Sequence, residues 1–308
     1  MGGQVGWKSE AAFGTGVVVD KFMPVLSANM TIDEGYLRSA GIRAGRRTRS
    51  LGRLGAKTVG ASVDMELPNT TLATLLNHVL GAVATTGVGP YTHEFTPGEH
   101  SGKSLTVQVG IEDSGGTVRP FTLLGTKVDS ATISCSVGEL AQLSVDLTAR
   151  DYSTATALAA ASYAAGLVPF TFIEGSVSVN GSAVASARAA TLTINKNLKS
   201  DRHVLGSRLI REQVEQDHFE ITTEITADFD NLTLFDLIAA GTAVTSTLTF
   251  NNGTESLVVE TNGQIVGDPP SLTNPGIEEQ TIRLDHSSNT SDADTITATL
   301  VNSEASAA

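Results

Sequence analysis

The side chains of this sequence that could carry chemistry are few and far apart. His93 and His100 share a short segment with Glu94 and Glu99, and imidazole and carboxylate groups of this kind can together bind a divalent metal ion. The same segment contains a proline and a glycine, which are typical of a solvated turn. We therefore expect no metal site here.

Carboxylate pairs are present, but their spacing does not suit acid–base catalysis. Sequence neighbours such as Glu112 and Asp113 would point to opposite faces of a strand, so they cannot act on one substrate. Asp228 and Asp230 share a face, but Asp230 precedes an expected helix and suits its N-terminus. Nucleophile-elbow, Walker and zinc-protease motifs do not occur in the sequence. We predict no catalytic residue, no metal and no cofactor, and a protein that is not an enzyme.

Composition excludes further classes of protein. The single Cys135 cannot form an internal disulfide or supply a thiolate metal site. A formal net charge of −13 opposes binding to a nucleic-acid backbone, which depends on Lys and Arg. No stretch approaches the roughly 18 to 20 apolar residues of a membrane span, and no secretory signal is visible at the start. We expect no membrane partner.

The charge is unevenly distributed along the chain. After Arg211 there are 17 Asp and Glu residues and one base, Arg283, which gives a net charge of −16 (1 − 17). A solvated loop beside an acidic surface is one interpretation. The other is a self-complementary surface that stacks head to tail. The basic counterpart is a segment without any acid, made of Arg38, Arg43, Arg46, Arg47, Arg49, Arg53 and Lys57.

The elements that must position these charges are mainly strands. Apolar residues alternate with polar ones in many short runs rich in Thr and Val, a pattern that predicts strands with one buried face. Asn180-Gly181 has the composition of a tight hairpin turn. Examples of the alternating runs are 59–67, 105–111, 131–137, 143–147, 221–229 and 296–300.

Two segments follow helical spacing instead. Leu72 to Leu80 has capping candidates at residues 69–71 and ends at Gly81, and Leu234 to Ile238 follows Asn231 and ends at Gly241. On the first helix, His78 is expected on the polar side, at the surface.

The two halves of the chain align at a constant offset. Ala28 to Ile32 falls on Ala190 to Ile194, since 190 − 28 = 162, and the same offset aligns the following strand, cap and helix. This shared order favours an internal duplication. Further on the offset shrinks, and Val145 is matched with Leu284.

We therefore predict a mainly β protein of two tandem repeats, each a β-sandwich or half-barrel with one short flanking helix. The expected layout is an N-terminal arm (1–27), a first repeat (28–154), an Ala-rich connector (155–169), a second repeat (170–302) and a frayed tail (303–308).

Several short phrases resemble the tail tube proteins, or major tail proteins, of long-tailed bacteriophages. The opening contains Trp7, Glu10 and the run Phe13-Gly14-Thr15. Later phrases are Gly125-Thr126-Lys127-Val128-Asp129-Ser130 and Val177-Ser178-Val179-Asn180-Gly181. The resemblance spans nearly the whole chain in layout.

This resemblance implies an architecture and a role. Such subunits join sheet edge to sheet edge in a ring, and rings stack into a hollow tube through which the genome leaves. Most members form rings of six chains, whereas chains that carry the domain twice form rings of three. The offset of 162 favours the trimeric, pseudo-hexameric ring here, with the sixfold alternative left open.

The resemblance also implies partners and a location. The chain would bind copies of itself, a tape measure protein, a tail terminator and distal tail or baseplate proteins. Double-stranded DNA would pass through the tube without specific binding. The protein would be part of the virion tail and would be assembled in the host cytoplasm.

Charge provides candidate residues for this role. An acidic lumen would keep DNA phosphates from adhering, and polar positions of the strands could line it, namely Asp64, Glu66, Glu224 and Asp228. The basic residues 38–57, together with Arg208 and Arg211 of the second half, are candidates for the contact between stacked rings.

Two other classes stay open from the sequence. One is a β-sandwich module that binds a surface, as in capsid decoration proteins or adhesins, which would never polymerise. The other is a hydrolase with an unrecognised site, which would contain a carboxylate with a strongly shifted pKa in a cleft.

Overall fold

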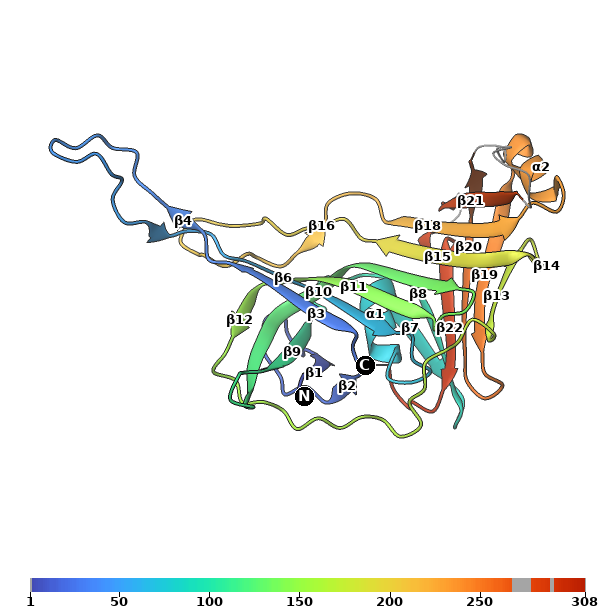
Figure 1. The fold of residues 1–308 in the computed structure, drawn as a ribbon, viewed down its shortest axis with the longest axis horizontal. Helices are drawn as coiled ribbons and strands as arrows, with labels where there is room; N and C mark the ends of the chain where they lie inside the picture. Colours follow the sequence, from blue (N-terminus) through green and yellow to red (C-terminus); the bar gives the residue numbers. More distant parts are fainter. Residues whose placement is uncertain (1, 268–277, 289–290, 308) are drawn as a thin grey trace.

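The computed structural model describes residues 2–267, 278–288 and 291–307, and these residues are mainly in antiparallel strands. Figure 1 shows an elongated body with a thin hairpin at one end and a short helix at the other. The mainly β class predicted from the alternating pattern is confirmed.

One continuous antiparallel sheet joins the two halves of the chain. Its strands follow the order β3–β6–β11–β10–β15–β18–β21, and β10 and β15 form the junction between the halves. Buried residues alternate with partly or fully exposed ones in β6, β11, β15, β18 and β21, so one face of the sheet packs on the core. The bounds are β3 (Ser27–Asp33), β6 (Thr58–Glu66), β10 (Val118–Ser136), β11 (Gln142–Ala149), β15 (Ala187–Asn195), β18 (Glu220–Asp228) and β21 (Glu279–His286).

A second sheet covers the core face of the first half. It follows the order β2–β1–β9–β10–β12, so the long strand β10 belongs to both sheets. The register of β10 shifts between Leu123 and Thr126, where Gly125 has φ +59° and a Cβ would lie 2.9 Å from Arg150. Glycine therefore permits the bend. The bounds are β1 (Gln4–Ser9), β2 (Lys21–Met23), β9 (Leu105–Glu112) and β12 (Asp151–Ser153).

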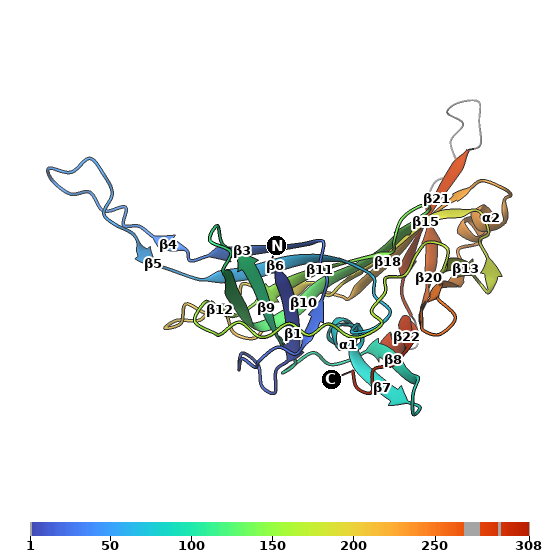
Figure 2. The ribbon, with the colours of Figure 1, turned by 60° about the horizontal axis from the view of Figure 1, so that its bottom comes forward.

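The second half has a corresponding second sheet, which a hairpin from the first half extends. The order is β14–β13–β19–β20–β22–β8–β7, and β20 also pairs with β21. Figure 2 shows this layer beside α1 and the C-terminus. The bounds are β7 (Gly81–Thr86), β8 (Tyr91–Pro97), β13 (Gly175–Val179), β14 (Ser182–Ala183), β19 (Ala243–Asn251), β20 (Ser256–Val266) and β22 (Ile296–Asn302). A short 3-10 helix covers Asp292–Asp294.

Strand registers repeat between the halves at the offset read from the sequence. Ala28 pairs with Val63 and Ile32 with Val59, whereas Ala190 pairs with Ile225 and Ile194 with Ile221. All four residues of the first half are thus shifted by 162, since 190 − 28 = 225 − 63 = 162. The pairing of β3 with β6 and that of β15 with β18 therefore have the same geometry.

The sequence match between β11 and β21 was displaced by two residues. Val145 pairs with Val63, and Ile282 pairs with Ile225, the counterpart of Val63. Ile282 therefore occupies the position of Val145, and the match of Val145 with Leu284 was wrong. Alternating strands keep their inward phase under a two-residue shift, so the pattern alone could not fix the register.

The two helices occupy different environments. α1 (Ala73–Leu80) is buried on nearly all sides, whereas α2 (Thr233–Ala240) has no fully buried residue. Gly81 and Gly241 end the helices at positive φ as predicted, and Asn231 Oδ1 accepts a hydrogen bond from Thr233 N. In α1, however, Glu304 Oε2 accepts from Ala73 N in place of the predicted caps at residues 69–71.

The predicted frayed tail is held to the body at Glu304 and Ala307, although Ser303, Ala305 and Ser306 are exposed. His93 Nε2 lies 2.9 Å from Glu304 O, and Asn77 Nδ2 donates to Ala307 O. Ala307 is 3% exposed. Small polar residues at a chain end indicated fraying, but the long-range partners of the tail outweigh that local tendency. Ala308 lies outside the described residues.

The predicted N-terminal arm and connector are also tied to the body. Val5 and Trp7 of β1 are buried, and β1 pairs with β9 along its full length, so residues 4–23 do not form a separate arm. In the connector, Ala159 N donates to Gln108 Oε1.

Three small hairpins complete the fold. Asn180 and Gly181 have φ +50° and +74° between β13 and β14, which confirms the predicted tight turn. The other two hairpins are β4 (Tyr36–Leu37) with β5 (Arg53–Leu54), and β16 (Leu198–Lys199) with β17 (Val214–Glu215). They lie at equivalent positions of the two halves, between β3 and β6 and between β15 and β18.

Candidate assembly surfaces

The first candidate surface is the outer edge of β3. Among the described residues, β3 pairs with β6 alone, whereas its counterpart β15 pairs with β18 on one side and β10 on the other. The backbone groups on the free side of β3 are therefore available to another strand. Such an edge is a ready template for pairing between chains.

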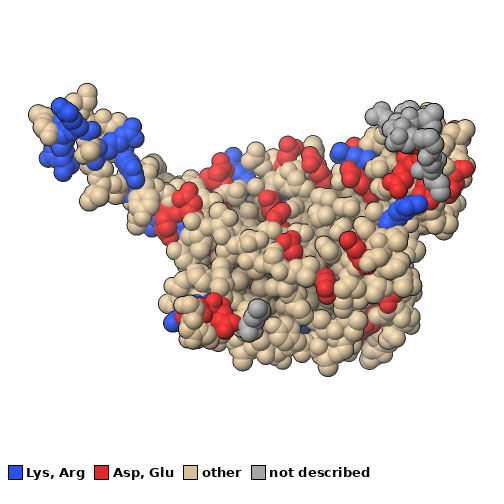
Figure 3. All heavy atoms as spheres, viewed as in Figure 1, with Lys and Arg blue, Asp and Glu red and all other residues tan. Residues whose placement is uncertain are grey.

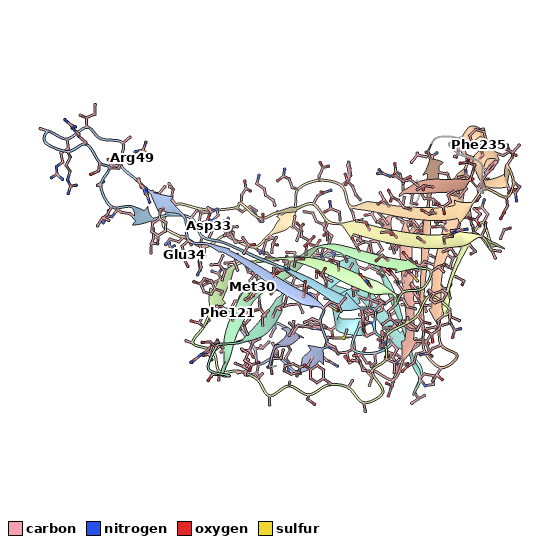
Figure 4. All side chains as sticks on the ribbon, in the orientation of Figure 1. Met30, Asp33, Glu34, Arg49, Phe121 and Phe235 are labelled. Atoms are coloured by element: carbon pink, nitrogen blue, oxygen red, sulfur yellow. The ribbon has the colours of Figure 1, made fainter. Side chains whose placement is uncertain are left out.

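Burial of the side chains at this edge gives the same indication. The inward residues of β15, Ala190, Leu192 and Ile194, are at most 5% exposed. Their counterparts on β3, Ala28, Met30 and Ile32, are only half-buried, although they belong to the same core face. Figure 4 labels Met30 on this strand. β3 thus carries apolar inward residues like those of the internal strand β15, but no neighbouring strand covers them.

The second candidate surface is the outward face of the continuous sheet. Most aligned positions across its strands carry Ser, Thr, Asn, Gln or acidic side chains. The exposed bases among the described strand residues of this face are Arg188, which pairs with Asp228 and Glu279, and Arg283. Figure 3 shows acidic atoms along the top of the body, where these strands lie. The acids of this face are Asp33, Asp64, Glu66, Asp146, Glu220, Glu224, Asp228, Glu279 and Asp285.

All four candidate lumen residues lie on this face. Asp64 accepts hydrogen bonds from Ser144 Oγ and Ser27 Oγ, both at 2.6 Å, and these bonds lower the pKa of its carboxyl group. Asp228 accepts a hydrogen bond from Arg188 Nε at 2.5 Å. Glu224 is exposed and Glu66 is half-exposed on the same face. The structure therefore brings together residues that are up to 164 positions apart (228 − 64).

The third candidate surface is the hairpin of residues 36–54, which we call the arginine arm. Its two strands are joined by two residue pairs, and the segment 38–52 extends beyond them into solvent. None of the ion pairs between described residues includes an arginine of this arm. Figure 3 shows the arm as the main cluster of basic atoms on this side of the molecule, and Figure 4 labels Arg49 on it. It carries Arg38, Arg43, Arg46, Arg47, Arg49 and Arg53.

Two of the predicted stacking residues are engaged at the base of the arm instead. Lys57 Nζ lies 2.5 Å from Asp151 Oδ1 and 4.0 Å from the ring centre of Tyr152. Arg208 donates to Glu34 Oε2 at 2.5 Å, and this bond lowers the pKa of Glu34. The Arg208 side chain and the hydrogen bond from Lys57 N to Arg208 O therefore join the two halves of the chain, whereas the Lys57 side chain pairs within the first half. Arg211 is exposed.

The loop between β15 and β18, the counterpart of the arginine arm, is docked on the first repeat. Lys127 Nζ donates to Glu212 Oε1 at 2.7 Å and to Gln213 O at 3.0 Å. Lys196 Nζ donates to His78 O at 2.7 Å, at the C-terminal end of α1, where a cation is favourable. Both lysines are at most 3% exposed. These contacts were not predicted, because a buried lysine has no local signature in the sequence.

The histidines are mostly buried, contrary to the prediction for His78. His78 is 6% exposed because the tail and Lys196 cover α1, and burial lowers its pKa to about 3. His93 lies in β8 and is fully buried rather than in a solvated turn. Among the residues that the structure describes, no group of three or more His, Cys, Asp or Glu side chains could hold a metal ion.

The titratable groups give no support to a hydrolase. The carboxyl pKa values that shift, those of Glu34, Asp64, Asp113 and Glu212, are all lowered, and each of the four groups accepts hydrogen bonds in an ordinary ion pair or polar cluster. A general acid would need a raised value. In the described part of the chain, neither helix has the length and apolar composition of a membrane span.

The family model of phage tail tube proteins matches residues 2–300. The chain belongs to the phage tail tube protein family. This membership gives the protein a structural role in the tail of a virion, where tail tube proteins assemble into a tube. A search of curated proteins finds no match.

Proposed function

We propose that this tail tube protein is the subunit of a hollow phage tail tube, in which rings of three chains stack to form the conduit for genome delivery. The observation that carries the proposal is the free edge of β3, which repeats the register of β15 but lacks its second partner and its burial. In a closed ring, the second repeat of a neighbouring copy pairs with this edge, as β10 pairs with β15 within the chain.

Three chains suffice because each chain contributes two equivalent repeats. The shared offset of 162 between the β3·β6 and β15·β18 registers supports this count. Half of the joints of a pseudo-hexameric ring are then made within a chain and half between chains. The ion pair of Lys127 with Glu212 joins the two halves within the chain, and Lys196 fixes the position of the second half against α1.

The outward face of the continuous sheet lines the lumen in this proposal. Asp64, Glu66, Glu224 and Asp228 would then face the DNA, and their charge would repel its phosphates. Several Ser side chains of the same face hydrogen-bond within it, as Ser27 and Ser144 do to Asp64. The channel would let DNA slide without holding it. This role is structural and requires no catalytic residue.

Rings would stack through the arginine arm. Six arginines that pair with no acid among the described residues require counter-charges, and the acidic second half of another copy can supply them. At each end, the tube would contact the tail terminator and the distal tail proteins, with the tape measure protein inside. Assembly in the host cytoplasm fits a chain that needs no disulfide.

Negative-stain microscopy of the purified chain, across concentrations and salt, tests the proposal. We expect rings or tubes with an open centre, in equilibrium with monomer. A chain that stays a compact monomer at all concentrations would contradict it, and would favour a module that binds a surface.

A further inference from the structure

The arginine arm and α2 lie at opposite ends of the strand direction. β6 leaves the arm at Thr58, and β18 ends at Asp228 and leads into α2. Four antiparallel pairings separate β6 from β18, so these two strands run parallel. Figures 1 and 4 show the arm, with Arg49, and α2, with Phe235, at opposite ends of the molecule. Copies stacked along this direction bring the arm of one against α2 of the next.

α2 lacks the cover that α1 has. The tail, Lys196 and Ser9 enclose α1, whereas no residue of α2 is fully buried. Leu232, which precedes α2, is 57% exposed, and Phe235 is half-exposed. Covering an apolar helix surface of this kind with a partner removes it from water and lowers the free energy of the system.

The charge around α2 complements that of the arm. Asp230 and Asp236 are exposed, and no described cation forms an ion pair with either of them. Asp228, by contrast, is already paired with Arg188. Two unpaired carboxylates therefore flank the exposed apolar residues of α2, and the arm presents guanidinium groups that can pair with them.

The arm also carries exposed apolar side chains that could contact the exposed apolar residues of α2. Ile42 and Leu51 are essentially fully exposed, at 105% and 96%, and Leu37 is 69% exposed. A hairpin that only needed solubility would not carry large aliphatic side chains among its arginines. Contact of Ile42 and Leu51 with Leu232 and Phe235 would exclude water from the surrounding ion pairs and strengthen them.

We propose that the arginine arm of one copy docks on α2 of a copy in the adjacent ring, with Ile42 and Leu51 against Leu232 and Phe235, and arm arginines against Asp230 and Asp236. This inference rests on the proposed function, because it names the surface that receives the arm in a stacked tube. The contact joins different patches of two copies, so it repeats without closing and extends the stack.

Cysteine cross-linking in assembled tubes tests the docking directly. In a Cys135→Ser background, the variant Ile42→Cys with Leu232→Cys is oxidised and separated by denaturing electrophoresis without reductant. We expect a ladder of linked chains, because each copy both gives and receives an arm. The matched control is Ile42→Cys with Val88→Cys, since Val88 is 96% exposed but lies in the turn between β7 and β8.

The outcomes separate this inference from the proposed function. Tubes in which the 42–232 pair links no more than the 42–88 control would overturn the docking and leave the tube intact. Failure of the Cys135→Ser parent to form rings or tubes under any condition would contradict the proposed function, and the docking with it.

A charge swap provides an independent test. Arg46→Asp with Arg47→Asp should lower the sedimentable tube fraction about tenfold at low salt, the effect of a few surface ion pairs. Asp230→Arg with Asp236→Arg should lower it similarly, and all four changes together should restore it. Asp217→Arg, before β18 at the end away from α2, is the control and should not restore it. No restoration by the four changes would overturn the docking.

Discussion

At the residue scale, buried lysines and histidines make the stability of the chain depend on pH. Lys196 is 1% exposed, and burial, followed by the charge of Lys127, lowers its pKa from 10.5 to about 7. Between pH 7 and 10 the unfolded chain therefore binds more protons than the folded chain. The free energy of unfolding consequently rises with pH in this window.

We predict that Lys196→Met removes this pH dependence. At pH 7 the variant should be more stable by up to a few kcal/mol, at about 1.4 kcal/mol per unit of pKa shift, less about 1 kcal/mol for the lost hydrogen bond to His78 O. The gain should shrink as the pH approaches 10. Urea unfolding at several pH values measures it, with the exposed Lys199→Met as control. A gain that does not depend on pH would contradict the account.

The histidines act in the acidic range. Burial lowers the pKa of His78 and His100 to about 3 and that of His286 to about 4. Unfolded histidines bind protons below about pH 6.5, so the free energy of unfolding falls as the pH drops from 6.5 towards 4. We expect His286→Gln to reduce this loss, by comparing urea midpoints at pH 7 and pH 5. An unchanged difference between the two midpoints would show that His286 does not contribute.

At the element scale, α1 depends on a residue far away in sequence. Glu304 Oε2 accepts from Ala73 N at 3.2 Å and from Asn302 Nδ2 at 3.0 Å. We predict that Glu304→Ala lowers the free energy of unfolding by about 1–2 kcal/mol, the usual cost of losing a helix cap. Chemical denaturation measures the loss. Ser303→Ala, next to it and exposed, should cost less than about 0.5 kcal/mol.

A charged residue at the β3 edge should leave the fold of the single chain intact but prevent its assembly into rings. Met30 is half-buried at the edge, so Met30→Lys should leave the chain folded while placing a charge where a neighbouring copy packs in the proposed ring. We expect an unchanged far-ultraviolet circular dichroism spectrum and loss of rings by light scattering. Met30→Leu should keep the rings. Normal ring assembly by a folded Met30→Lys variant would exclude β3 as the joint.

Elements were predictable from the sequence where the signal was local or repeated. The alternating pattern predicted the strands, and glycines predicted the ends of both helices. The offset of 162 predicted that β3 with β6 and β15 with β18 share one pairing register. Long-range contacts were not predictable. Glu304 as the cap of α1, and the burial of His78 beneath Lys196, join residues 231 and 118 positions apart. The edge of β3 looked like any other strand, since pairing depends on tertiary structure and not on alternation.

At the scale of the whole molecule, the arrangement of charge agrees with a tube that DNA passes through. The acids gather on the outward sheet face and in the second half, while the arginines of the arm extend away from the body (Figure 3). The polar sheet face, the free edge and the arm point in different directions. One chain can therefore line a channel, close a ring and extend a stack at the same time.

The number of chains in each ring tests the central claim most directly. Cryo-electron microscopy of the assembled protein, with the symmetry determined from the images, provides this number. The account predicts three chains of 31.9 kDa per ring, six similar lobes around an open centre, and β3 of each chain paired with the second repeat of its neighbour. Rings of six chains, or a β3 edge left unpaired in the assembly, would contradict it.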